Sequence, residues 1–182
     1  MDYKALFHLM HPGFFDKAFI RNLDPEEVFD EQILALSDFD VHELEIPIPE
    51  GITFGFFQGD HEELLAAVQE VEEDWAQYFQ KDDRVFCAFH EGKPVSFCLT
   101  DSMGEYDMDG RHIRIAGPGC VGTVPAYRRK GIGLKMVQLA TEALKREGYD
   151  YSYIHYTAVG HWYGRLGYKT ILKWNAKGLL EE

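Results

Sequence analysis

Residues 123–133 read Thr-Val-Pro-Ala-Tyr-Arg-Arg-Lys-Gly-Ile-Gly and join an extended apolar stretch to a predicted helix. Three consecutive cations, Arg128 to Lys130, precede two glycines in the first turn of that helix. The first N–H groups of a helix have no carbonyl partner, and the helix dipole makes this end positive. Glycine also lets a ligand approach the backbone closely. The stretch therefore predicts a site for a phosphate or diphosphate group.

Two well-known phosphate motifs do not fit this stretch. The dinucleotide fingerprint needs a third glycine at position 136, which is Met136. The P-loop needs Gly-Lys-Ser/Thr after its second glycine, and Leu134-Lys135 does not supply it. For the loop taken alone, a solvated basic turn before an ordinary helix is the alternative.

The pattern from residue 52 onward predicts alternating strands and helices. Asp60 is placed to cap a long helix, and Gly148 follows the end of another. The stretch 113–124 is extended but interrupted by Gly117-Pro118-Gly119, which predicts a bulge or a splay. The order indicates a mixed-sheet α/β domain. Strands are expected at 52–57, 85–89, 95–99, 113–124, 151–156, 168–172 and near 179, and helices at 60–79, 131–147 and 159–166.

The first fifty residues are predicted to be helical. Asp24 is an N-cap candidate, followed by Pro25 and, at the capping-box position, Glu27. Apolar residues then recur at helical spacing, at positions 29, 33 and 36. The Ile-Pro-Ile-Pro-Glu-Gly run at 46–51 is the best boundary. We therefore predict a helical N-terminal extension over 1–50 and a second domain over 51–182.

Composition limits the classes of function. The chain has 182 residues, 46% hydrophobic and 27% charged, as in ordinary globular proteins. A net charge of −13 argues against nucleic-acid binding. Residues 1–110 hold 26 acidic and 6 basic residues, whereas residues 111–182 hold 5 and 12. The C-terminal part therefore suits an anionic ligand.

Targeting and metal signals are weak. No apolar run reaches the roughly 18–20 residues of a membrane span, and the N-terminus lacks a signal-peptide pattern. We therefore expect a cytoplasmic protein that binds no membrane. Cysteines at 87, 98 and 120 have no disulfide or zinc spacing. His155 with His161, and His8 with His11, lack a third ligand at suitable spacing, so we expect no metal.

The basic loop also carries a resemblance to a known family. Arg128–Gly133 matches the Arg/Gln-x-x-Gly-x-Gly/Ala signature of the GNAT superfamily of N-acetyltransferases. The preceding Val-Pro-Ala-Tyr, the following helix, and Tyr163 to Tyr168 stand in the family's order, so the resemblance covers about residues 52–182. It implies a GNAT-like mixed, mostly antiparallel central sheet flanked by helices, with a splayed pair of central strands.

The resemblance implies acetyl-CoA as cosubstrate and assigns its contacts. The loop backbone would hold the pyrophosphate, and Arg128 would help to hold the loop. Pantetheine would pair with the preceding strand, because a splayed strand leaves N–H and C=O groups free for an amide-bearing ligand. The implied cofactor-binding residues are Gly122, Thr123, Val124, Arg128, Arg129, Lys130, Gly131, Ile132, Gly133 and, further on, Thr157.

The implied reaction is direct acetyl transfer to a primary amine of a small molecule or peptide. The leaving thiolate needs a proton, and Tyr163 is our candidate acid, since a phenol stays protonated at neutral pH. It lies in a pattern that resembles the family's Asn-x-x-Ala-x-x-Tyr-x-x-x-Gly-Phe. Thr157 and Gly160 depart from it, standing where Asn and Ala are usual.

The general base is open at this point. A lysine-like amine with a pKa of about 10.4 is neutral in roughly one molecule in a few thousand at pH 7. The family's usual carboxylate is missing from residues 114–124. His155 is a candidate base with a suitable intrinsic pKa, although it also fits an ordinary sheet histidine. Glu105, Asp107 and Asp109 in the preceding loop, or a chain of water molecules, are the alternatives.

The acceptor and the rival functions stay open as well. Acidic residues at 70–74 and 101–109 would attract a cationic amine, such as a polyamine, an amino sugar or a peptide N-terminus, or are solvated surface. Residues 1–50 are candidates to cover the acceptor site or to form a homodimer contact. A non-catalytic CoA-binding or sensing module is the alternative to an enzyme.

Overall fold

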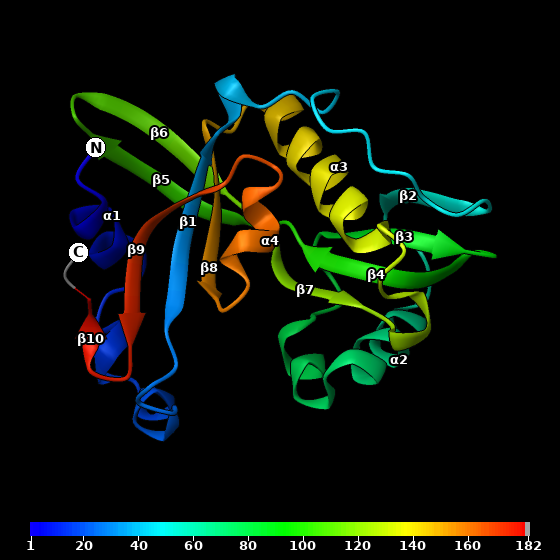
Figure 1. The fold of residues 1–182 in the computed structure, drawn as a ribbon, viewed down its shortest axis with the longest axis horizontal. Helices are drawn as coiled ribbons and strands as arrows, with labels where there is room; N and C mark the ends of the chain where they lie inside the picture. The colour runs from blue at the N-terminus through cyan, green and yellow to red at the C-terminus, as the bar shows by residue number, and fades with distance from the viewer. Residues whose placement is uncertain (181–182) are drawn as a thin grey trace.

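The computed structural model describes residues 1–180, which form two β-sheets and the helices around them (Figure 1). One sheet has six strands in the order β10-β9-β1-β8-β6-β5, and the other has four in the order β2-β3-β4-β7. The strands are β1 (Phe29–Ala35), β2 (Ile52–Phe56), β3 (Val85–His90), β4 (Lys93–Leu99), β5 (Ser102–Met108), β6 (Arg111–Ala116), β7 (Gly119–Thr123), β8 (Tyr151–Thr157), β9 (Lys169–Asn175) and β10 (Gly178–Leu179).

The helices lie on both sides of these sheets (Figure 1). In the described part of the chain the α-helices are α1 (Tyr3–Met10), α2 (His61–Val71), α3 (Ile132–Arg146) and α4 (Gly160–Gly164). Short 3-10 turns occur at Phe14–Asp16, Ala18–Asn22, Leu36–Asp38, Glu73–Tyr78 and Pro125–Tyr127. Within residues 1–180, no helix has the length and apolar character needed to cross a membrane.

The predicted fold class is confirmed. The pairings are antiparallel except for a short parallel one between β6 and β8. The apolar face of α3 packs into the main core, with Met136, Val137 and Ala140 fully buried. The Asp60 carboxylate accepts from the backbone N–H of Glu62 and so caps α2, which ends at Val71, earlier than expected.

The central strands part at Gly117. β6 pairs with β8 only at Ile115–Tyr151 and Ala116–Ser152. The chain then turns away, and β7 pairs with β4 in the other sheet. A Cβ on Gly117 would lie 1.8 Å from the carbonyl oxygen of Tyr153, so only glycine fits where the chain leaves β8. The predicted splay therefore lies between β7 and β8, which diverge in Figure 1.

The prediction of a helical extension over residues 1–50 is wrong for residues 29–35. These residues form β1, which pairs antiparallel with both β8 and β9 inside the six-stranded sheet. Because both faces of β1 are covered, five of its seven residues are buried and the strand shows no polar–apolar alternation. Phe29 and Ile33 thus lie at helical spacing by coincidence. The N-terminal part supplies a central strand of the sheet.

A second correction concerns residues 102–108, which we expected in a loop. They form β5, the edge strand that pairs with β6. The two strands meet at Asp109-Gly110, where φ is 51° and 74°. An Asp-Gly pair with positive φ is typical of a tight β-hairpin. The hairpin signal was in the sequence, but the polar composition of β5 hid the strand.

Candidate functional site

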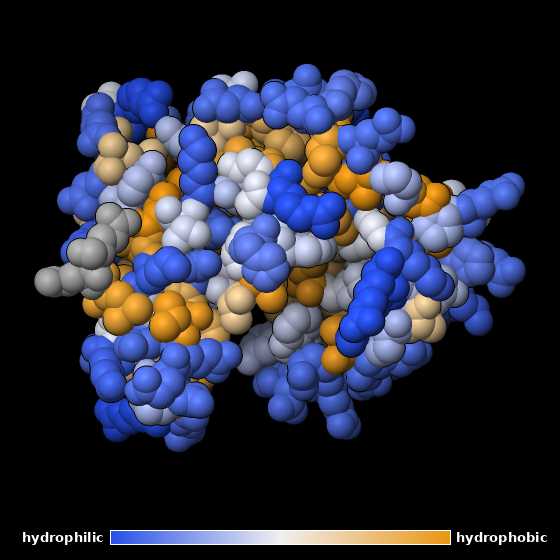
Figure 2. Space-filling model, viewed as in Figure 1, coloured by the Kyte–Doolittle hydropathy of each residue, from blue (hydrophilic) through white to orange (hydrophobic). Residues whose placement is uncertain are grey.

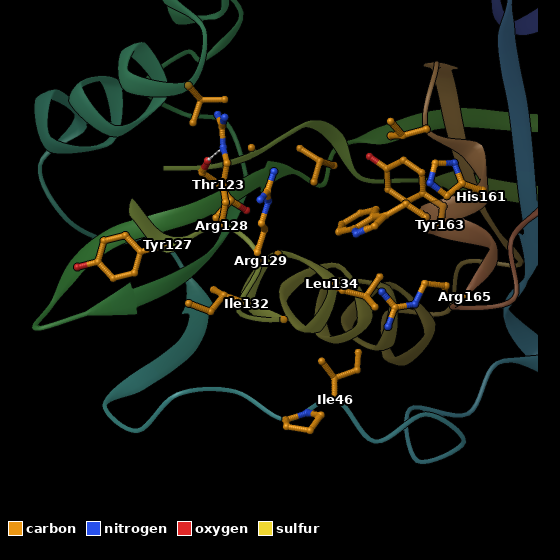
Figure 3. Close-up of a pocket in the computed structure, with 18 of the residues that line it drawn as sticks. Ile46, Thr123, Tyr127, Arg128, Arg129, Ile132, Leu134, His161, Tyr163 and Arg165 are labelled. Atoms are coloured by element: carbon orange, nitrogen blue, oxygen red, sulfur yellow. Dashed lines mark hydrogen bonds between the residues drawn. The ribbon is translucent and has the colours of Figure 1, made fainter. Parts of the chain in front are cut away.

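A cavity of about 680 Å³ lies between the start of α3, the strand β7 and the short helix α4 (Figure 3). The basic loop forms one end, and Tyr163, His161 and Arg165 stand at the other. Figure 2 shows a hollow between the two halves of the molecule on the viewed face. The lining residues are Glu45, Ile46, Pro47, Val71, Val121, Gly122, Thr123, Tyr127, Arg128, Arg129, Gly131, Ile132, Gly133, Leu134, Val159, His161, Trp162, Tyr163 and Arg165.

The start of α3 has the features of an anion site. Gly131 is the N-cap residue, with φ of 78° in the left-handed region, and no side chain caps the helix. Arg129 is also left-handed, with φ of 61°. Successive left-handed and right-handed residues turn backbone N–H groups toward one side of a loop. The uncapped N–H groups therefore face a cavity edged by cationic side chains.

Each of the two motif glycines is required by a close neighbour. A Cβ on Gly131 would lie 2.6 Å from the carbonyl oxygen of Pro47. A Cβ on Gly133 would lie 2.6 Å from Oγ1 of Thr123. Ile46 and Pro47, which belong to the run 46–51 that we predicted as a domain boundary, therefore form part of the cavity wall, together with Glu45. The sequence held no signal for that role beyond the two prolines of the run.

The basic side chains divide between holding the loop and lining the cavity. Arg128 Nε donates to the carbonyl oxygen of Thr123 at 2.9 Å, as the dashed line in Figure 3 shows. Lys130 Nζ donates to the carbonyl oxygen of Ala126 at 2.9 Å and lies over the Tyr127 ring. Arg129 points into the cavity. The loop is therefore braced by its own cations, and Arg129 is left to meet an anion.

The strand β7 is the open wall of the site. It is the edge strand of the four-stranded sheet, so its second backbone edge faces the splay. Its pairing with β4 shifts register between Phe97 and Leu99, and Cys120 has φ of 45°. These features mark a β-bulge, which re-aims the backbone next to the splay. Gly122 and Thr123 line the cavity as predicted, whereas Val124 is buried beside it.

Tyr163 projects from α4 and is 6% exposed. Its ring meets that of Trp162 edge-on, with centroids 4.8 Å apart. Burial raises the pKa of the Tyr163 phenol well above its usual value of 10. The hydroxyl therefore stays protonated at every physiological pH, as a proton donor must.

Four predicted site residues lie outside the cavity lining: Val124, Lys130, Thr157 and His155. The Thr157 hydroxyl accepts from the backbone N–H of Val159 at 3.1 Å, which fixes the turn into α4. His155 lies on β8 and bonds Glu31. Among the predicted loop residues, Lys130 braces the loop from outside the lining. The remaining loop residues from 128 to 133 come together around the cavity.

The unusual glycine at position 160 has a structural cause. A Cβ there would lie 2.1 Å from Oδ2 of Asp30 and 2.8 Å from Nε2 of Gln32. Gln32 is 2% exposed and donates to the carbonyl oxygen of Gly160 and to Oγ1 of Thr170, both at 3.0 Å. Side chains of β1 therefore occupy the space that the methyl group of the family's usual alanine would need, and they hold the helix that carries Tyr163.

His155 lies in a cluster with Glu31 and His11 that the sequence did not predict. Glu31 of β1 is fully buried, and both its oxygens lie 2.9 Å from His155 Nδ1. The His11 ring stacks on the His155 ring, with centroids 3.9 Å apart and 16° between planes. Burial lowers the pKa of His11 to about 3, and His155 adds to the effect. The three residues lie far apart in sequence, so no local spacing could indicate the cluster.

The other acid–base candidates point elsewhere. His112 on β6 bonds both Asp107 and Glu105, at 2.9 and 3.0 Å, on the exposed β5–β6 hairpin. Asp109 pairs with the N-terminal ammonium of Met1 at 3.0 Å. These carboxylates already have partners on the exposed β5–β6 hairpin or at the N-terminus.

Comparisons with known proteins agree with this geometry. The family described as "Acetyltransferase (GNAT) domain" matches residues 81–170, which include the basic loop, α3 and Tyr163. No curated protein matches the chain. Together with the fold, the family match identifies residues 81–170 as a GNAT acetyltransferase domain.

Solved structures share the fold at low sequence identity. The GCN5-related glucosamine N-acetyltransferase region of a fungal multi-domain GH3 β-N-acetylglucosaminidase is 23% identical, with a TM-score of 0.67, over 84% of this chain and 20% of that one. A GCN5-related N-acetyltransferase from Kribbella flavida is 22% identical, with a TM-score of 0.56, over 87% and 60%. One from Sphaerobacter thermophilus is 19% identical, with a TM-score of 0.56, over 84% and 51%. The chain thus spans a fifth to three fifths of these proteins.

Proposed function

We propose that this protein is an acetyl-CoA-dependent N-acetyltransferase that moves an acetyl group to a primary amine of a small molecule or peptide. One observation carries the proposal. The uncapped start of α3, edged by Arg129, and the protonated Tyr163 hydroxyl face one cavity beside a splayed pair of strands. A diphosphate at one end would leave a thioester within the splay at the other.

The chain's own groups would act in a simple order. Backbone N–H groups of residues 129–133 bind the diphosphate, and the free edge of β7 pairs with the amides of pantetheine. The amine then attacks the thioester carbon, and Tyr163 gives its proton to the departing sulfur. A backbone N–H near Val124 is our candidate donor to the oxyanion.

Direct attack is favoured over an acyl-enzyme. The thiol closest to the splay along β7 is Cys120, which is partly buried. Burial raises the pKa of Cys120 to about 11. Since the thiolate is the nucleophilic form, this cysteine stays unreactive at neutral pH.

Binding of acetyl-CoA is tested at Gly133. Gly133→Asp puts a carboxylate against the proposed diphosphate site and beside Thr123, so affinity should fall at least about 100-fold. Gly55→Asp is the matched control, because a Cβ there meets nothing within 4 Å. Calorimetric titration with acetyl-CoA measures both. Equal affinity in the two variants, with wild-type melting behaviour, would remove the assignment of the loop.

Turnover is tested by thiol release with a panel of amines. The panel should hold a polyamine, glucosamine and a peptide with a free N-terminus. Glucosamine belongs in it because one structural relative is described as a glucosamine N-acetyltransferase region. Activity confined to acidic acceptors would contradict the proposal of a cationic amine.

A non-catalytic CoA-binding module is the second candidate. It is favoured by Thr157, whose hydroxyl is taken up by the backbone N–H of Val159. Tight acetyl-CoA binding with no thiol release across the panel would decide for the module. A cytoplasmic location, a homodimer, and the absence of a metal cofactor and of nucleic-acid or membrane partners also remain proposals.

A further inference from the structure

Glu31 is a fully buried carboxylate at the centre of the six-stranded sheet. A buried charge is costly unless it is paired and hydrogen-bonded. Trp174 Nε1 donates to its Oε1 at 2.7 Å, the backbone N–H of Tyr156 at 3.2 Å, and His155 Nδ1 lies 2.9 Å from both oxygens. We propose that Glu31 and His155 form a carboxylate–imidazole dyad that removes the proton from the acceptor amine, an inference that rests on the proposed function.

The hydrogen bonds define which nitrogen would act. An ionised carboxylate only accepts hydrogen bonds, so Nδ1 of His155 must carry the proton that it shares with Glu31. Nε2 then keeps its lone pair and is the atom able to take a proton. The bonds from Trp174 and Tyr156 fix the carboxylate, so the imidazole is oriented by a positioned third group.

A local irregularity of the sheet builds this arrangement. The β1–β8 register shifts between Asp30 and Gln32, and Tyr156 has φ of 56°. A bulge of this kind re-aims backbone groups. Here it accompanies the Tyr156 N–H that meets the carboxylate of Glu31. The hydrogen bond from the Tyr156 N–H to the Glu31 carboxylate therefore explains why a bulky residue adopts a positive φ here.

The dyad lies across the sheet from the cavity. Ile154 packs in the cluster that contains α3 and Tyr163, whereas Tyr153 packs with Leu6 of α1. His155 contacts Phe14, with ring centroids 5.0 Å apart, and so shares the face of Tyr153. An acetyl group held from the cavity side would therefore be open to attack from the face that carries His155.

His155 also lies in the splayed half of β8. The pairing of β8 with β6 ends at Ser152, so the edge of β8 beyond it borders the splay. The His155 side chain is 25% exposed, whereas Glu31 is 0% exposed. An acceptor can thus reach the imidazole, and water cannot reach the carboxylate.

His11 completes the cluster but does not convert it into a metal site. Ligand atoms of His11, Glu31 and His155 lie within 4.8 Å of one another. A metal ion needs lone pairs that converge on one point. The two rings are stacked, with centroids 3.9 Å apart and 16° between planes, so their lone pairs lie in two separate, nearly parallel planes and do not converge on one point. A stacked neutral His11 instead shields one face of His155.

His155 Nε2 takes one proton from the ammonium, and the freed lone pair forms the C–N bond at the thioester carbon. The C–S bond breaks, and Tyr163 gives its proton to sulfur and recovers one from the nitrogen of the new amide. His155 then releases its proton to water. One ammonium and one thioester give one amide, one thiol and one proton.

The test compares His155→Ala with a matched histidine. His112→Ala also removes a histidine bonded to carboxylates, but on the exposed hairpin. With an amine that the wild type acetylates, His155→Ala should lower kcat at pH 7 by about 100-fold or more, leaving the KM for acetyl-CoA unchanged. His112→Ala should change neither. Free imidazole should restore part of the His155→Ala rate.

Glu31→Gln tests the positioning role. An amide would donate to Nδ1, place the proton on Nε2 and remove the acceptor lone pair. If His155 is the base, the wild type should show an acidic limb in its pH–rate profile and Glu31→Gln should lack it, and the melting temperature of the variant checks that it is folded. Titratable groups that face His155 are Glu31 from β1, His11 after α1, and Tyr153 and Tyr156 from β8 itself.

The outcomes separate the two proposals. If His155→Ala keeps the turnover and the pH–rate profile of the wild type, the dyad is overturned, while the assignment of the protein as an enzyme stays intact. A stoichiometric metal in purified protein, lost in the same variant, would overturn the dyad in favour of a metal site. A wild type that binds acetyl-CoA but acetylates no amine would refute the proposed function, and the dyad with it.

Discussion

Gly117→Ala tests where the central strands part. A Cβ at this position would lie 1.8 Å from the carbonyl oxygen of Tyr153, with Tyr153 C at 2.8 Å and N at 2.9 Å. An ordinary carbon–oxygen contact is about 3.3 Å, so the strands would have to separate by about 1.5 Å. The clashing atoms belong to the backbone, so no side chain can rotate away to make room.

The cost follows from that separation. It would break the parallel pairing of β6 with β8, which holds only at Ile115–Tyr151 and Ala116–Ser152. Overpacking costs about 1–3 kcal/mol and each lost hydrogen bond about 1 kcal/mol, so the free energy of unfolding should fall by about 3–5 kcal/mol. For a chain of this size, Tm should fall by roughly 6–20 °C.

Urea unfolding and calorimetry measure the effect against a close control. Gly119→Ala lies two residues further on, where a Cβ meets only Leu99 Cβ at an ordinary 3.8 Å. Its free energy of unfolding should change by less than about 0.5 kcal/mol. If the two variants unfold at the same urea concentration, the close approach of Gly117 to β8 is wrong, and so is our account of the splay.

Three further predictions concern other parts of the molecule. Tyr163→Phe should lower kcat about 10- to 100-fold and leave the affinity for acetyl-CoA unchanged. Because burial raises the pKa of Tyr163, its ionisation should not lower the wild-type rate below about pH 10. Full activity in Tyr163→Phe would mean that another group is the acid. Gly160→Ala should cost about 1–3 kcal/mol by displacing Asp30 and Gln32, as measured by urea unfolding, whereas Gly164→Ala, where a Cβ meets nothing within 4 Å, should cost nothing. Because burial lowers the folded-state pKa of His11 to about 3, only the unfolded chain takes up the proton of this histidine below about pH 6.5. The free energy of unfolding should therefore drop by about 1–2 kcal/mol from pH 7 to pH 5. A His11→Gln variant whose free energy of unfolding falls equally steeply with pH would refute this.

Local signals account for the parts of the fold that the sequence predicted. The basic loop, the cap at Asp60 and the apolar face of α3 depend on residues within one or two turns of each other. The strand β1 was not predicted because both its faces are covered, so its sequence lacks the polar–apolar alternation that indicates a strand. Its neighbours in space are β8 and β9, more than a hundred residues away in sequence.

The candidate site divides in the same way. The cavity end that binds the diphosphate was predicted, because a helix start, glycines and cations are contiguous in the chain. His155 was found only as one of several candidate bases. Its partner Glu31 was hidden in a segment interpreted as helix, and only the register of β1 against β8 brings the two together.

The same strand supports both sides of the proposed chemistry. Asp30 and Gln32 contact Gly160 at the start of α4, which carries Tyr163. Glu31, between them, bonds His155. Successive side chains of a strand point to opposite faces of the sheet, so three consecutive residues of β1 position the proposed acid on one face and the proposed base on the other. Residues 30–32 of the N-terminal part therefore belong to the proposed catalytic unit, and the departure from the family's alanine at position 160 is a consequence of that arrangement.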